Sequence, residues 1–221
     1  MSLGRKIVFV LCLIVFVGSA GMLLNYFLTG MREQSSLEDL AKLKTEREDM
    51  KTDKGTVIGK YVDLYEANSD IIGWITVDGT KIDYPVMQTQ DDPEFYLRRN
   101  FQKEHATAGV PFMDASSDIF VPTSNFLIYG HNMKNGTMFG QLKNFSKDDS
   151  AYNKSKYFWI FTPEKIYRYE IISAYTTAVD SDTYTLFKGP GQEFVDYMKK
   201  IVSLIAALAL LLVTSCSSGG G

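Results

Sequence analysis

The sequence predicts a mainly β fold, an all-β barrel or sandwich with added helices, behind an N-terminal transmembrane helix. Short apolar and aromatic segments alternate with turn residues from about residue 70 onward, which is typical of strands joined by hairpins. Aromatic residues, which are enriched in strands, make up 13% of the chain. A long uncharged apolar segment precedes these strands. We therefore expect one exported β domain on a single membrane helix.

The apolar segment covers residues 7–29, which are 23 consecutive residues without a charge. At about 1.5 Å per residue, a helix of this length crosses the ~30 Å hydrocarbon core. Arg5 and Lys6 precede it and the first acid is Glu33, so the N-terminus is expected inside and the domain outside the cell. The alternative is a signal peptide cleaved after the small residues at 18–20. The apolar segment continues past them, which favours an uncleaved single-pass anchor in the cell membrane.

Composition divides the chain into four parts. We expect a membrane anchor over residues 1–30, a helical stalk and lead-in helix over 31–69, a β domain over 70–201 and an atypical tail over 202–221. The stalk is charge-dense up to residue 54, which predicts a solvated helix that holds the domain off the membrane. Apolar side chains at helical spacing over 57–65 predict a helix that packs on the domain.

Turn signals predict the elements of the β domain. They are a hairpin over 74–84 with its turn at Asp78-Gly79, a strand buried on both faces at 126–129, a hairpin with arms at 156–161 and 166–176, and an amphipathic helix over 192–201.

Composition also excludes several function classes. The 23 basic and 26 acidic residues give a net charge of −3, which argues against a nucleic-acid binder. The two cysteines, Cys12 and Cys216, exclude a disulfide scaffold and a multi-cysteine metal site. The two histidines, His105 and His131, argue against a histidine-rich metal site.

One segment carries the main candidate for chemistry. Residues 125–133 read NFLIYGHNM, so an apolar strand leads through Gly130 to His131 at its end. Loops at the ends of rigid strands often hold catalytic side chains. Taken alone, a single histidine in this place is more often structural. His105 lies between charged residues in a predicted loop and is not a candidate.

With its surroundings, this segment resembles the sortases, the cysteine transpeptidases that attach proteins to bacterial cell walls, and specifically class B. The similar segments are IIGWITVDGTKIDYPVMQ at 71–88, FYLRRNF at 95–101, GVPFMD at 109–114 and NFLIYGHNMKNGTMFGQLKNF at 125–145. The last contains a YGHNM core that carries the family's catalytic histidine, which corresponds to His131.

The resemblance implies a β-barrel with N-terminal helices and one late helix, in a membrane-bound enzyme of a Gram-positive bacterium. It implies a Cys-His-Arg site that needs no metal or organic cofactor. A cysteine thiolate would attack the Thr carbonyl of an Asn-Pro-x-Thr type sorting motif in a surface protein and form a thioacyl-enzyme. His131 would act as general acid and base, and an amine of a cell-wall precursor would resolve the intermediate.

The C-terminal part departs from the family pattern. Cys216 is the only downstream cysteine and hence the candidate nucleophile, but no arginine follows Arg168 to stabilise an oxyanion. Residues 198–221 also read as a bacterial lipoprotein signal: two lysines, an apolar run of 12 residues and a Val-Thr-Ser-Cys lipobox. On that interpretation the tail is foreign, the last strands are missing and Cys216 is a lipidation residue or has no role.

These observations leave three functions open. The first is a class B sortase-like cysteine transpeptidase. The second is a catalytically inactive, truncated or fused domain that acts at most as a peptide-binding module. The third is a truncated product without a stable fold.

Overall fold

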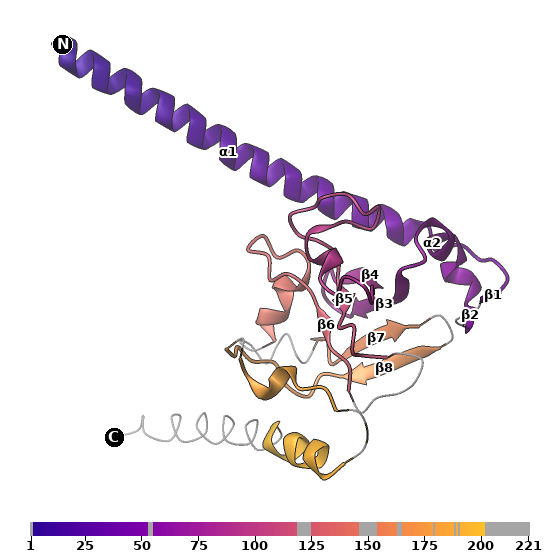
Figure 1. Ribbon diagram of the computed structural model, residues 1–221. Helices are drawn as coiled ribbons and strands as arrows, with labels where there is room; N and C mark the ends of the chain where they lie inside the picture. Colours follow the sequence, from indigo (N-terminus) through magenta and orange to yellow (C-terminus); the bar gives the residue numbers. More distant parts are fainter. Residues whose placement is uncertain are drawn as a thin grey trace, which may run out of the picture.

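The computed structural model describes residues 2–52, 55–118, 125–145, 154–162, 165–178, 180–187, 189 and 191–201. A single long helix, α1 (Leu3–Lys42), lies at the N-terminal end, and its first half projects away from the rest of the chain (Figure 1). By length and composition this helix could cross a membrane, and none of its most apolar 18-residue stretch is buried on the domain. The membrane helix predicted over residues 7–29 is therefore present as a helix of suitable length.

The last turns of α1 pack on the domain. Leu37 and Leu40 are only 4% and 3% exposed, and Gln34 accepts a 3.2 Å hydrogen bond from the Tyr84 hydroxyl. The prediction of a solvated stalk is therefore wrong for these turns. Two leucines three residues apart share one helix face, and that face is sufficient to dock the helix against the sheet.

After α1 the chain forms a small hairpin and then a short helix. Strands β1 (Met50–Thr52) and β2 (Gly55–Val57) pair antiparallel, and η1 (Gly59–Tyr61) leads into α2 (Val62–Ala67). The segment predicted as a lead-in helix is helical only from Gly59 onward, and Val57 belongs to a strand instead. The reason is that Val57 pairs with Met50 of β1, a contact that its helical spacing to Tyr61 does not indicate.

The domain is built on a curled six-stranded sheet with the order β6-β5-β4-β3-β7-β8. Its strands are β3 (Ile71–Val77), β4 (Asp83–Met87), β5 (Phe112–Met113), β6 (Ile128–Tyr129), β7 (Tyr157–Phe161) and β8 (Ile166–Glu170). Only the β4–β5 pair is parallel among these described neighbours. The mainly β fold is confirmed, and in the described part of the chain β6 and β8 form the two ends of the sheet.

Both predicted hairpins are confirmed. Strands β3 and β4 pair around the Asp78-Gly79 turn, where Gly79 has a φ of +72°, and β7 pairs with β8 from Tyr157–Glu170 to Phe161–Ile166. The second arm of the latter hairpin is shorter than predicted, because β8 ends at Glu170. Residues 171–178 continue without regular structure.

Strand β6 differs from its prediction in burial. It comprises two residues, both half-buried, and lies at an end of the described sheet. The continuous apolar run predicted a strand buried on both faces, and this is wrong. Phe126 and Ile128 line the hollow described in the next subsection. Their side chains are therefore only partly enclosed, although the segment is apolar.

The two faces of the sheet are covered by different segments. On one face the Trp74 ring stacks on the ring of Tyr61, which belongs to η1, with 6.3 Å between the ring centroids. On the other face Ile75 and Val77 lie beside Ile160 of β7, and residues 126–145 cover them. The predicted late helix is present over residues 192–201, and Phe187 packs against its Phe194. Residues 202–221 lie outside the described part of the chain.

Candidate functional site

The local structure that places His131 is a tight loop after β6. A Cβ atom on Gly130 would come within 2.6 Å of the Phe139 ring, so the ring can pack over the backbone only where there is no side chain. The Phe139 N–H donates a 3.0 Å hydrogen bond to the His131 carbonyl, and Asn132 forms an isolated bridge with Met138. These contacts close residues 131–139 into one loop and fix the backbone of His131.

The His131 ring is half-buried against a second loop, residues 105–110. Its pKa is lowered from the usual 6.5, first by burial and then by the nearby Arg98 guanidinium. Two groups oppose this shift: the backbone of Ala108, which accepts a hydrogen bond from the ring, and the negative charge of Glu33. The net result is an imidazole whose pKa lies below its usual value, close to the Ala108 backbone, and histidine is the side chain best suited to exchange a proton near neutral pH.

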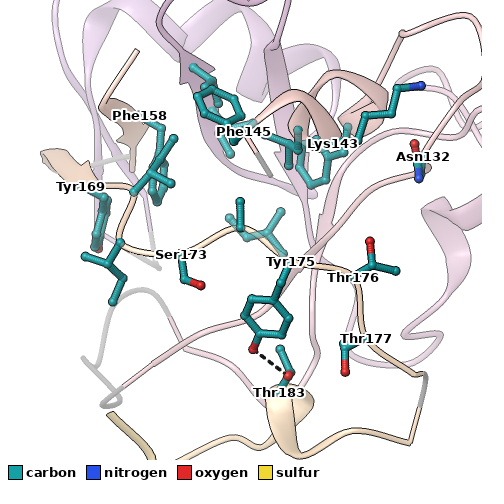
Figure 2. A pocket seen from close by; sticks show the side chains of 18 of the residues that line it. Asn132, Lys143, Phe145, Phe158, Tyr169, Ser173, Tyr175, Thr176, Thr177 and Thr183 are labelled. Carbon is teal, nitrogen blue, oxygen red and sulfur yellow. Dashed lines mark hydrogen bonds between the residues drawn. The ribbon is translucent and has the colours of Figure 1, made fainter. Parts of the chain in front are cut away.

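A hollow of about 750 Å³ lies beside the 131–139 loop (Figure 2). Its apolar wall comes from β3, β7 and β8, including Phe158, Ile160 and Tyr169. Asn132, which follows His131, lines the hollow together with Phe139. Figure 2 shows Tyr175 and Thr183 next to one another in its lining, joined by a 2.9 Å hydrogen bond between their hydroxyl groups. The hollow is therefore lined by apolar and hydroxyl side chains and is adjacent to the loop that carries His131.

The other residues considered from the sequence lie in different places. Cys216 is outside the described residues, so no distance to His131 follows. His105 is exposed and forms a bridge with Arg99. Arg168 lies on β8 with its guanidinium 4.7 Å from the Tyr157 ring. Within the described part of the chain, no group of three or more His, Cys, Asp or Glu residues is arranged to hold a metal ion.

Two residues near His131 were missed by the sequence analysis. Arg98 and Glu33 both act on the ring electrostatically. Arg98 falls within the FYLRRNF segment that carries part of the resemblance, but nothing in that segment indicates that it faces His131. Glu33 precedes Ala108 by 75 residues, and such a distant contact leaves no signal in a single sequence.

Comparison with known proteins decides the family. A family model described as the sortase domain matches residues 75–216. This chain belongs to the sortase family. The sortase domain therefore begins within β3 and includes the His131 loop, and its match extends to the position of Cys216.

Relatives of known class place this sortase in class B. Sortase B of Listeria monocytogenes is 32% identical over 170 residues, which are 76% of this chain and 68% of that protein. Sortase B of Staphylococcus aureus is 33% identical over 144 residues, which are 64% of this chain and 58% of that protein. The chain thus spans less than two thirds of the staphylococcal enzyme.

A solved structure supports the same fold. The structure of a Staphylococcus aureus sortase B–substrate complex superposes with a TM-score of 0.69 at 24% identity, covering 80% of each chain. The curled sheet and the helices of this chain therefore have a sortase-like arrangement. The class B resemblance of the motifs is confirmed by the relatives.

Proposed function

We propose that this sortase is a membrane-anchored cysteine transpeptidase that cleaves a sorting motif in surface proteins and joins them to the cell wall. His131 is its general acid and base, and Cys216 is its nucleophile. The observation that carries the proposal is the His131 loop, which holds a half-buried imidazole of lowered pKa beside the Ala108 backbone and next to an apolar hollow. The family match supports Cys216, because it extends to that position.

The reaction proceeds by acyl transfer. His131 first takes the proton of the Cys216 thiol, and the resulting thiolate attacks the carbonyl carbon of the scissile Thr peptide bond while the carbonyl electron pair moves to the oxygen. As the tetrahedral intermediate collapses, the C–N bond breaks and protonated His131 gives its proton to the leaving amine. An amine of a cell-wall precursor then attacks the thioester, His131 takes its proton, and the thiolate leaves. The products are a new amide and, once His131 has returned the proton to the thiolate, the original enzyme.

The partners follow from the same proposal. The donor is a surface protein with an Asn-Pro-x-Thr type motif, and the staphylococcal relative was solved as a substrate complex. The acceptor is a cell-wall precursor amine. Both are outside the cell, and Arg5 and Lys6 before the apolar half of α1 favour the same side for the domain.

A peptide-binding module is the second candidate. It is favoured by the absence of any arginine after Arg168 among the 221 residues. Loss of an oxyanion donor lowers a rate by about 10²- to 10³-fold while binding in an apolar hollow can persist.

The test uses the full chain in detergent micelles with a fluorogenic Asn-Pro-x-Thr peptide and an acceptor amine. Slow cleavage that disappears in both Cys216→Ala and His131→Ala, and not in His105→Ala, supports the transpeptidase. Saturable peptide binding with no cleavage in any of these proteins supports the binding module instead.

A further inference from the structure

We propose that Glu33, on the membrane-anchor helix α1, is a positioning residue for His131. Glu33 positions the imidazole by holding the 105–110 loop, against which the imidazole lies. The catalytic consequence rests on the proposed function of His131, whereas the positioning itself rests only on the contacts that follow.

The first step is the contact between helix and loop. Glu33 Oε1 accepts a 2.7 Å hydrogen bond from the Thr107 N–H, and Oε2 accepts a 3.2 Å hydrogen bond from the Ala108 N–H. One carboxylate thus binds two consecutive backbone amides with both of its oxygens. Hydrogen bonds to an ionised acceptor are about twice as strong as neutral ones, and the two together fix the orientation of the loop.

The loop is held on its other side by the short helix η2 (Phe95–Arg98). The Arg98 guanidinium donates a 2.6 Å hydrogen bond to the Thr107 carbonyl, and the Ala106 N–H donates a 3.0 Å hydrogen bond to the Arg98 carbonyl. Gly109 has a φ of +60°, and a Cβ atom there would come within 2.4 Å of the Tyr96 and Leu97 carbonyl oxygens. The loop therefore lies between α1 and η2, with Glu33 as its contact to α1.

The last step joins the loop to the imidazole. Ala108 donates its N–H to Glu33, and the Ala108 backbone lies close enough to the His131 ring to raise its pKa. The same residue therefore connects the carboxylate on α1 to the imidazole. Removing the carboxylate frees the Ala108 backbone to shift, and the surroundings of the imidazole then change.

Glu33 also acts on His131 through charge. The charged groups that face the imidazole are Arg98 from η2, which disfavours its protonation, and Glu33 from α1, which favours it. Burial disfavours protonation most. A neutral residue in place of Glu33 leaves burial and Arg98 less opposed, so the pKa of His131 falls further below its usual value.

The experiment follows the two histidines by NMR in the full chain in detergent micelles, with His105→Gln to assign the His131 signals. Glu33→Gln retains the shape and one acceptor oxygen, and Glu33→Ala removes both. The matched control is Glu38→Gln, which neutralises an exposed acid five residues along the same helix. Amide exchange at Thr107 and Ala108 is measured in each protein.

The proposal expects the His131 titration midpoint to shift downward in Glu33→Gln, and amide exchange at Thr107 and Ala108 to accelerate by about tenfold or more in Glu33→Ala. Glu38→Gln should change neither. An unchanged His131 midpoint and unchanged exchange in a folded Glu33→Ala protein would overturn it. Neither measurement needs turnover, so a failure of the transpeptidase assay leaves this test intact, and the reverse also holds.

Discussion

The indole Nε1 of Trp74 donates a 2.5 Å hydrogen bond to Oδ1 of Asp83 across the β3–β4 hairpin. The same carboxylate oxygen accepts from the Thr76 hydroxyl at 2.8 Å and pairs with Lys44 at 3.2 Å. Lys44 also lies 3.7 Å from the centre of the Trp74 ring. One carboxylate thus connects the segment that follows α1 to the buried indole of the central hairpin.

The first prediction concerns this carboxylate. Burial raises the pKa of Asp83, but hydrogen bonds from Trp74 and Thr76 and the charge of Lys44 outweigh burial and lower the pKa below its usual 3.8. Asp83→Ala leaves the indole N–H without its acceptor, so we expect a loss of about 1–3 kcal/mol in the free energy of unfolding. Denaturant titration at pH 7 measures it.

The pH dependence of that loss has a definite sign. Because the folded pKa is the lower one, the stabilisation by Asp83 is present above pH 3.8 and disappears as the pH falls through the folded pKa. The stability difference between wild type and Asp83→Ala should therefore shrink below pH 3.8. Asp39→Ala, at an exposed ion pair with Lys42, serves as the control and should show a much smaller loss. A difference that stays constant down to pH 2.5 contradicts the assignment.

A second prediction concerns the glycine before His131. Gly130→Ala places a Cβ atom 2.6 Å from the Phe139 ring, so the 131–139 loop must move. We expect a destabilisation of about 1–3 kcal/mol by overpacking, together with a changed His131 NMR signal. Gly189→Ala meets no atom within 4 Å and should leave both unchanged. Since the obstacle is a side chain, Phe139→Ala in the Gly130→Ala background should restore the His131 signal.

A third prediction separates the two histidines. His131→Ala should lower the rate of peptide cleavage by at least about 10²-fold, as expected for a general acid–base group. His105→Ala should retain the wild-type rate, because His105 is exposed and only its backbone pairs with Arg99. Initial rates under identical peptide concentrations measure both. Equal losses in the two variants would remove His131 from its assigned role.

A fourth prediction concerns the membrane helix. If the apolar half of α1 is an uncleaved anchor with the domain outside, protease added to intact cells degrades the domain and spares the first residues of the chain. Mass spectrometry of the membrane fraction identifies the protected fragment. Recovery of a soluble product that starts near residue 21 would instead indicate a cleaved signal peptide.

A fifth prediction concerns the rate itself. The 221 residues contain no arginine after Arg168, so we expect little or no turnover, about 10²- to 10³-fold below that of a sortase with an arginine at its oxyanion. Robust cleavage that depends on Cys216 would contradict this and show that the C-terminal tail is native to the enzyme.

Local signals predicted most of the fold and the loop position of His131 after a short strand. The Asp78-Gly79 turn and the Thr162–Lys165 turn each predicted a hairpin because turn chemistry is encoded in adjacent residues. The sequence pointed to His131 for the same reason, because the strand, the glycine and the loop around it are contiguous in the chain.

Contacts between distant segments could not be predicted. The docking of Leu37 and Leu40 depends on a sheet face formed more than thirty residues later, so a charge-dense helix appeared solvated. Glu33 and Arg98 meet at the 105–110 loop only once α1 and η2 have been brought together by the fold. Neither residue belongs to a sequence pattern that indicates this role.

The most direct test of the proposed chemistry is detection of the thioacyl-enzyme. The full chain is incubated with an Asn-Pro-x-Thr peptide without acceptor amine, and intact-protein mass spectrometry follows the acyl adduct over hours. The account predicts slow accumulation of one adduct that maps to Cys216, is absent in Cys216→Ala and forms at least about 10²-fold more slowly in His131→Ala. Saturating peptide binding with no adduct on Cys216 would contradict it.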